Sequence, residues 1–150
     1  MRVALDTNIL AYAEGMNGAP RRREAVELIE AIPQSSIVLP VQVLGELFMV
    51  LTRKAGRTPV AARTAVLGWR NAFALTETSP AAFLSAMDLT LNQFSLWDAV
   101  IFCSAAEADC RILLSEDMHD GFVGMGLTII NPFARRRHSL LEALLGQDPS

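Results

Sequence analysis

The hydrophobic residues of this chain gather in short continuous runs, separated by longer segments in which they recur at helical spacing. Four runs rich in Val, Ile and Leu occupy residues 2–5, 37–39, 111–114 and 127–130, and a weaker one occupies residues 74–77. Unbroken apolar runs of this length are typical of strands that are buried on both faces of a sheet. We therefore expect a sheet of four or five strands.

Helical segments fill the intervals between these runs. Thr58-Pro59 and Ser79-Pro80 each join an N-cap residue to a proline in the first turn, which is a common start of a helix. Helices are expected at the following residues: 8–14, 20–32, 40–55, 59–73, 81–91, 96–108 and 135–145. Strands that alternate with helices predict an α/β fold with a central parallel sheet covered by helices on both faces.

Length and composition limit the class of protein. The chain has 150 residues, 51% of them hydrophobic, and a mass of 16.3 kDa. This is the size of one domain with a full core, which excludes intrinsic disorder. The formal net charge of −3 and the pI near 5.3 argue against a protein that coats nucleic acid through bulk positive charge. A local basic patch stays compatible with this composition.

The cysteines and the N-terminus bear on location. Cys103 and Cys110 are expected in one helix, and seven residues at roughly 1.5 Å each separate them by about 10 Å, too far for a disulfide. We expect both to be reduced core residues of a cytoplasmic protein. Asp6 lies where a signal peptide needs its apolar stretch, and the longest apolar stretch, 37–51, is broken by polar residues. No membrane span is therefore expected.

Four acidic residues are placed where strands end or where the following helices begin. Asp6 ends the first strand, and Asp117 closely follows the strand at 111–114. Glu46 lies in the helix after the second strand, and Asp98 lies in the first turn of the helix that begins after Ser95. Ligands of parallel sheets bind outside the carboxyl ends of the strands. The four carboxylates are therefore expected to converge at one edge of the sheet.

Three of these acids also have a structural explanation when each is taken alone. Asp6 and Asp117 could cap the segments that follow them, and Asp98 forms a variant of the capping box with Ser95. A further acid, Asp120, is expected to be a turn residue.

Glu46 is harder to explain structurally. It is the only acid between Glu30 and Glu77, and its helix is apolar on nearly every face, so we expect that helix to be mostly buried. An unpaired buried carboxylate is costly, and the nearest cations in sequence, Arg53 and Lys54, are more than a helical turn away. A bound cation is the simplest partner. Oxygen ligands without His or Cys favour Mg²⁺ or Mn²⁺, which predicts a metal-dependent phosphoryl-transfer or hydrolase site.

Five short motifs occur in order along the chain. They are Leu5-Asp6-Thr7-Asn8-Ile9-Leu10, the isolated Glu46 after a strand, Ser95-Leu96-Trp97-Asp98-Ala99, Leu114-Ser115-Glu116-Asp117-Met118 and Asn131-Pro132-Phe133. Together they resemble a PIN domain over residues 1–133, and more narrowly a VapC-type toxin of a bacterial toxin–antitoxin pair. The resemblance implies a three-layer α/β/α fold and a Mg²⁺- or Mn²⁺-dependent endoribonuclease that cleaves RNA by metal-activated water. It also implies a homodimer that an antitoxin holds inactive.

The resemblance assigns roles to seven residues. The catalytic, metal-binding acids carried over are Asp6, Glu46, Asp98 and Asp117, and the supporting polar residues are Asn8, Ser95 and Ser115. Asp6 and Asp98 are expected to bind the main ion directly, Glu46 through a water, and Asp117 to complete the acidic ring. Glu116 and Asp120 receive no required role. Residues 134–150 are expected to form a C-terminal helix and tail of the same domain.

Two arginine clusters are candidates for contact with the RNA backbone. Arg135, Arg136 and Arg137 are assigned to substrate binding, because the forked guanidinium suits phosphate. The cluster at 21–23 could serve RNA or face the antitoxin, and either cluster could be a solvated run of charge. A PIN-type DNA or structure-specific nuclease and a non-catalytic RNA- or protein-binding PIN scaffold remain alternative functions.

Overall fold

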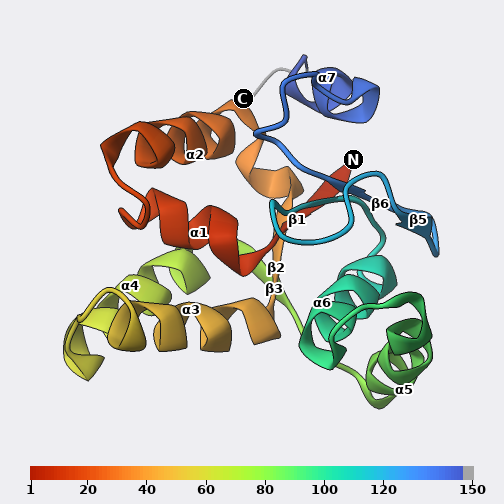
Figure 1. Ribbon diagram of the computed structural model, residues 1–150, viewed down its shortest axis with the longest axis horizontal. Coiled ribbons are helices and arrows are strands. Elements are labelled where there is room, and N and C mark those ends of the chain that lie inside the picture. The colour runs from red at the N-terminus through yellow and green to blue at the C-terminus, as the bar shows by residue number, and fades with distance from the viewer. Residues whose placement is uncertain (147–150) are drawn as a thin grey trace.

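The computed structural model describes residues 1–146 and shows, within them, a six-stranded sheet in the order β3-β2-β1-β4-β6-β5 (Figure 1). The strands are β1 (Arg2–Leu5), β2 (Ile37–Pro40), β3 (Ala74–Thr76), β4 (Cys110–Leu114), β5 (Val123–Gly124) and β6 (Leu127–Ile130). Five of them pair in parallel, and β5 pairs antiparallel with β6. The parallel part matches the expected strands, and β5 adds one strand that the sequence pattern did not indicate.

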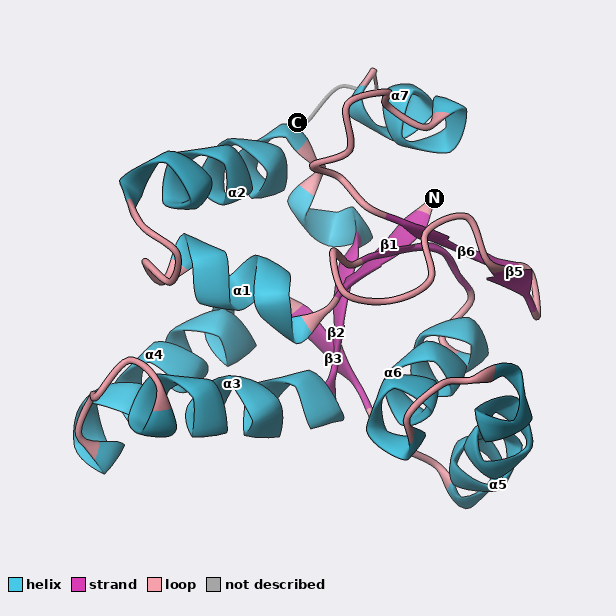
Figure 2. Cartoon of the chain, viewed as in Figure 1, coloured by secondary structure: helices cyan, strands magenta, loops and turns pink. Residues whose placement is uncertain are grey.

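Helices enclose this sheet on two sides, which confirms the three-layer α/β prediction. The helices are α1 (Thr7–Ala13), α2 (Ala19–Ala31), α3 (Val41–Arg53), α4 (Pro59–Ala72), α5 (Pro80–Leu89), α6 (Leu96–Glu107) and α7 (Ser139–Leu145), with short 3-10 turns at Gln34–Ser36 and Thr90–Asn92. In Figure 2, α1 and α2 lie to one side of the magenta strands, and α5 and α6 lie to the other. Helix α3 runs beside α1 and packs on α4.

The central strands are buried because both of their faces are covered. Val3, Ala4 and Leu5 of β1 have no exposed surface, and the same holds for Ile112 and Leu113 of β4. Alternating polar residues would leave one face of each strand for water, and these strands have none inside their buried stretch. The continuous apolar runs therefore form a two-sided core.

The topology places one crevice at the centre of the sheet. Strand β1 pairs with β2 on one side and with β4 on the other, so the strand order changes direction next to β1. The carboxyl ends of β1 and β4 lie at the same edge, because Leu5 pairs in register with Leu114. Such a switch point is where parallel sheets bind ligands.

Two local predictions were wrong in detail. Cys110 begins β4 and does not share a helix with Cys103, because the left-handed Asp109 (φ 62°) follows the end of α6. Both cysteines are nevertheless free and buried, as expected. Helix α7 begins at Ser139, after His138 caps it, and not at Arg135. The three arginines therefore lie in the preceding loop.

The C-terminal segment packs onto the same core as the sheet. Leu141 and Leu144 of α7 are 1% and 0% exposed and belong to the main hydrophobic cluster. The division into a PIN-like region at 1–133 and a C-terminal helix and tail of the same domain at 134–150 stays a prediction, and residues 147–150 of that tail lie outside the described part of the chain. Within residues 1–146, no helix is long and apolar enough to cross a membrane. A cytoplasmic location stays a prediction.

Candidate active site

Asp6 is the best-anchored acid at the central crevice. Its backbone N donates to the carbonyl O of Leu114 (2.9 Å), which extends the β1–β4 pairing to the site. Its carboxylate accepts hydrogen bonds from Thr7 N on Oδ1 (2.7 Å) and from Ser115 Oγ on Oδ2 (2.6 Å), with Asn8 Nδ2 at 3.5 Å from Oδ2. Asp6 also caps α1, so the role of helix cap and the candidate role of metal ligand are compatible in this residue.

Ser115 shapes the loop that follows β4. Its Oγ accepts from the backbone N of Asp117 and of Met118, both at 3.2 Å, while it donates to Asp6. Asn8 adds a second link, because its Oδ1 accepts from Glu116 N (3.4 Å). The supporting residues Asn8 and Ser115 thus join Asp6 to the exposed Asp117.

Glu46 projects from α3, the helix that follows β2. Its carboxylate Oε2 accepts from Thr7 Oγ1 (3.2 Å), and its side chain is half-buried. The expectation that α3 is mostly buried was wrong, because only four of its 13 residues are buried and Val41 and Met49 are 45% and 39% exposed. Thr7 is a contact that sequence reasoning missed, although its position directly after Asp6 was a usable signal.

Asp98 lies in the first turn of α6 and is half-buried. Ser95 is the N-cap of that helix, and its Oγ accepts from Asp98 N (3.1 Å). Ser95 therefore orients the turn through the Asp98 backbone. The Asp98 carboxylate lines the same pocket as the other three acids, so the structure brings all four together.

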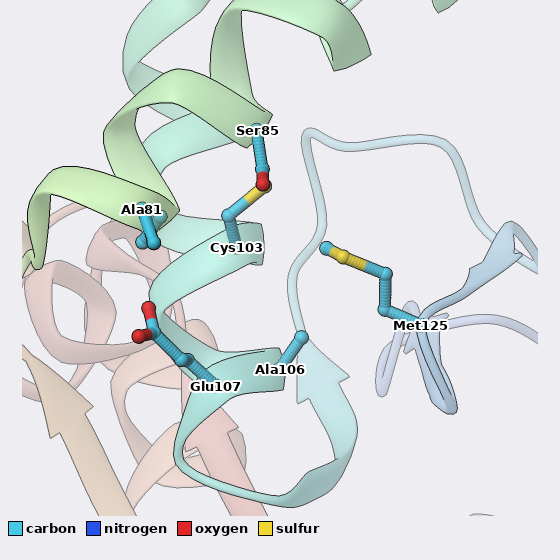
Figure 3. A pocket seen from close by; sticks show the side chains of 7 residues that line it. Ala81, Ser85, Cys103, Ala106, Glu107 and Met125 are labelled. Atoms are coloured by element: carbon cyan, nitrogen blue, oxygen red, sulfur yellow. The ribbon is translucent and has the colours of Figure 1, made fainter.

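This acidic pocket has a volume of about 380 Å³. Its lining residues come from α1, α3, α6 and the loops beside them: Asp6, Thr7, Asn8, Ala11, Tyr12, Met16, Asn17, Glu46, Val50, Lys54, Asp98 and Asp117. A second pocket, between α5, α6 and the β5–β6 turn, is smaller at about 230 Å³ (Figure 3). Its one carboxylate, Glu107, already accepts from Ser79 Oγ (2.6 and 2.8 Å), so this pocket offers no free acidic cluster.

The electrostatics of the acidic pocket disfavour negative charge. Burial raises the pKa of Asp6 to about 6, opposed by the hydrogen bonds from Ser115 and Thr7, and Asp98 and Asp117 raise it further. Burial, followed by the charge of Asp6, raises the pKa of Glu46 to about 7. Raised pKa values are expected for carboxyl groups that share a partly dehydrated site.

The pKa of Asp98 is raised as well. Burial is the main cause, a hydrogen bond with Ser95 opposes it, the charge of Asp117 adds to it, and His119 lowers it. None of the ion pairs found within residues 1–146 involves any of the four acids. The four carboxylates therefore repel one another, and no ion pair within residues 1–146 offsets their charge.

The chemistry of the candidate ligands in the acidic pocket fits a hard divalent cation. Only oxygen ligands are offered, and Mg²⁺ binds through one or two carboxylates while it keeps several waters. No group of three or more His, Cys, Asp or Glu side chains in the described part of the chain is arranged so that it could hold a metal ion by itself. An ion in this pocket would therefore rely on one or two carboxylates and keep its other positions for water and phosphate.

A family comparison covers most of this arrangement. The PIN domain model matches residues 3–119, which include all four acids. The chain belongs to the PIN domain family. The match confirms the resemblance on which the acid assignments rest, and the roles of the individual residues stay proposals. No curated protein matched this PIN domain.

Solved structures share the fold. VapC20 of Mycobacterium tuberculosis, a sarcin–ricin loop cleaving toxin, is 20% identical, with a TM-score of 0.64 over 77% of this chain and 91% of that one. A toxin–antitoxin complex from Klebsiella pneumoniae is also 20% identical (TM-score 0.65; 87% and 98% covered). DNA-bound VapBC from Salmonella typhimurium is 16% identical (TM-score 0.61; 86% and 96% covered). At these identities the likeness shows the fold alone.

The predicted RNA-binding arginines lie outside the acidic pocket. Arg135, Arg136 and Arg137 are exposed, and Arg137 lines a different pocket beside α2 and α7. Lys54, at the end of α3, is instead the one cation among the described residues that lines the acidic pocket. The sequence analysis set Lys54 aside as too far from Glu46 to be its partner, although eight residues are close to two full helical turns and keep both residues near one side of the helix.

Proposed function

We propose that this PIN domain is a Mg²⁺- or Mn²⁺-dependent endoribonuclease and the toxin of a toxin–antitoxin pair. The observation that carries the proposal is the meeting of Asp6, Glu46, Asp98 and Asp117, from four separate elements, in one pocket where none of them forms an ion pair with another described residue. One buried and two half-buried carboxylates beside the exposed Asp117 favour a bound divalent ion over an empty site. Family membership and the shared fold of the VapC structures support the nuclease assignment.

Asp6 and Asp98 would hold the ion, with Glu46 and Asp117 completing its acidic surroundings. When bound, a divalent ion supplies Lewis acidity at the phosphate and lowers the pKa of water. Ser115 and Thr7 keep the Asp6 carboxylate ionised and fixed by donating to its two oxygens. Asn8 bridges Asp6 to the Glu116 backbone and so keeps the two strand ends in register.

The reaction that fits this site is hydrolysis at the P–O3′ bond. A water attacks the scissile phosphorus in line with O3′ and loses a proton to solvent, while the P–O3′ bond breaks and O3′ takes up a proton from solvent to leave as a hydroxyl. The products are a 5′-phosphate and a 3′-hydroxyl, and no His or Lys base from the chain is required.

End-labelled RNA tests this proposal directly. The wild-type protein should cut it in Mg²⁺ or Mn²⁺ and leave 5′-phosphate ends, and both EDTA and Asp6→Asn should abolish the cleavage. Cleavage at full rate in EDTA would contradict the metal assignment. Cleavage of duplex or flap DNA in place of RNA would make the protein a DNA nuclease, and binding without cleavage would make it a scaffold.

The toxin assignment includes two protein partners, an antitoxin and a second copy of the chain. Toxin–antitoxin complexes among the structures of the same fold support it. Expression of the chain alone should slow host growth, and Asp6→Asn should relieve the arrest. Equal arrest by both proteins would mean that the acids are not its cause. Light scattering should give about twice the monomer mass, and a monomer would contradict the dimer.

A further inference from the structure

Glu116 has no part in the acidic pocket, yet it receives contacts from two helices. The Tyr12 hydroxyl of α1 donates to Glu116 Oε1. The Arg21 guanidinium of α2 lies with Nη2 3.3 Å from Glu116 Oε2. Both carboxylate oxygens of Glu116 are therefore engaged by side chains that are distant in sequence.

Arg21 is itself held in place on several sides. Its guanidinium carbon lies 4.3 Å from the ring centre of Phe133 and 5.5 Å from that of Tyr12. The two rings meet edge to face at 5.7 Å, and Arg21 Nη1 lies 3.4 Å from Glu24. Stacking on two aromatic rings restricts the guanidinium plane, which strengthens a directed ion pair.

The contacts to Glu116 are partly shielded from water. Tyr12 is 7% exposed, and the side chains of Arg21 and Glu116 are 31% and 26% exposed. Burial, followed by the hydrogen bond to Glu116, raises the pKa of Tyr12 to about 12, so its hydroxyl remains a donor at neutral pH. A partly shielded cluster of this kind holds its geometry better than an ion pair on an open surface.

The position of Glu116 in the chain links its contacts to the acidic pocket. Glu116 lies between Ser115, which donates to Asp6, and Asp117, which lines the acidic pocket. Its own backbone N donates to Asn8 Oδ1. The loop is thus tied to the pocket through its backbone and tied to α1 and α2 through the Glu116 side chain.

We propose that Glu116, held by Tyr12 and Arg21, is a positioning residue that fixes the loop after β4 and so aims the Asp117 carboxylate into the acidic pocket. The proposal rests on the proposed function of that pocket. It predicts that weakening the Glu116 contacts changes the affinity for Mg²⁺ and the turnover number, while the affinity for RNA stays the same.

Glu24 provides a matched control. It forms the other ion pair of Arg21, one turn along the same helix, and its side chain is 55% exposed. Glu24→Gln therefore removes an equal charge beside the same arginine. Glu116→Ala should lower kcat about tenfold and raise the Mg²⁺ concentration needed for half of the melting-temperature shift by a similar factor, as is typical of residues that orient metal ligands. KM should stay within twofold, and Glu24→Gln should match wild type in all three measurements.

A double-mutant cycle separates positioning from general stability. Tyr12→Phe keeps the ring and removes only the hydroxyl donor, so it should cause part of the Glu116→Ala defect and add almost nothing in the Glu116→Ala background. Glu116→Gln, which keeps an acceptor for Tyr12, should restore part of the activity. These two results, with Glu24→Gln unchanged, support the proposal.

Three outcomes would overturn it. A defect in Glu24→Gln equal to that of Glu116→Ala would mean that Arg21 acts through stability alone. A change in KM alone would make Glu116 a substrate contact. Independent effects of Tyr12→Phe and Glu116→Ala would mean that Tyr12 does not act through Glu116. A wild-type protein with neither cleavage nor a Mg²⁺-dependent melting shift would instead refute the proposed function itself, which distinguishes the two failures.

Discussion

Ser115 Oγ lies 2.6 Å from Asp6 Oδ2 and joins two residues that are 109 positions apart in the chain. Both side chains are buried, and each follows one of the two central strands. A hydroxyl that donates to a carboxylate favours its ionised form, and this hydrogen bond lowers the pKa of Asp6 against the larger effect of burial. The same hydroxyl orders the loop that carries Asp117.

Ser115→Ala should therefore lower RNA cleavage by about tenfold to a hundredfold, as expected when a partner of a metal ligand is removed. The loss of a donor should also raise the pKa of Asp6, so the acidic limb of the pH–rate profile should move to higher pH. Ser104→Ala is a suitable control, because Ser104 is a fully buried serine of α6 outside the pocket. Wild-type activity and an unmoved profile in Ser115→Ala would contradict this role.

The raised pKa values predict an unusual dependence of stability on pH. Burial raises the pKa of Asp6 from its usual 3.8 to about 6, and that of Glu46 from its usual 4.5 to about 7. Between about pH 4 and 7 the folded protein holds protons that the unfolded chain has released, so the free energy of unfolding falls as the pH rises. For the buried Asp6 alone the loss is on the order of 2–3 kcal/mol.

Thermal melts in EDTA at several pH values measure this effect. The melting temperature of the wild type should fall between pH 4.5 and 7.5 more steeply than that of Asp6→Asn, which lacks the titrating group. Millimolar Mg²⁺ should reduce the slope, since the ion stabilises the ionised carboxylates. Equal slopes for wild type and Asp6→Asn in EDTA would show that Asp6 does not carry a raised pKa.

Asp98→Asn should abolish activity and stabilise the metal-free protein. The change removes a half-buried charge beside Asp117, while the backbone N of residue 98 keeps its hydrogen bond to Ser95. After screening by solvent, the gain should be about 1 kcal/mol, or a few degrees in melting temperature. Added Mg²⁺ should raise the melting temperature of the wild type more than that of the variant. A variant that melts below wild type in EDTA would make Asp98 mainly a structural residue.

The strands and the acids were predictable because their signals are local. The apolar run at β1 is followed at once by Asp6, and a parallel sheet dictates which edge that residue occupies. Strand β5 was not predictable, because its two residues are fixed by pairing with β6, and Val123 is 65% exposed. Cys110 was misplaced because helix-compatible residues continue up to Asp109, whose left-handed backbone ends the run.

The contacts around the acids were less accessible to sequence reasoning. The Thr7–Glu46 hydrogen bond and the Tyr12–Glu116 hydrogen bond connect elements whose relative placement depends on the packed core. Arg21 is one of three consecutive arginines, and nothing in the sequence distinguishes which of them makes an ion pair with another part of the fold. Only the fold shows that it turns inward to Glu116 while Arg22 and Arg23 stay exposed.

The arginine cluster before α7 gives a prediction about substrate binding. If Arg135, Arg136 and Arg137 contact RNA, their joint replacement by Gln should lower the slope of log Kd against log salt by up to about 2, because each phosphate contact on a single strand contributes about 0.7. Binding of a fluorescent RNA at several salt concentrations measures the slope. An unchanged slope would assign these exposed residues to a different role, such as contact with the antitoxin.

Lys54 allows a sharper test of where the RNA backbone lies. Three residues that line the acidic pocket, Glu46, Val50 and Lys54, follow one another along α3 at intervals of four residues. At this spacing, Glu46 and Lys54 lie about 12 Å apart along the helix axis. That spacing suits a neighbouring phosphate and not the scissile one. Lys54→Gln should lower the salt slope by about 0.7 and raise KM while kcat is kept.

Arg53 is the matched control for this substitution. It precedes Lys54 at the same end of α3 and is also exposed, but it does not line the pocket. Arg53→Gln removes the same charge from the same helix end, so any general effect of net charge on RNA binding should be equal in the two variants. A larger change in Lys54→Gln would place the RNA backbone along the Glu46–Lys54 side of the pocket. Equal changes would mean that Lys54 contributes only to the overall field of the protein and makes no phosphate contact of its own.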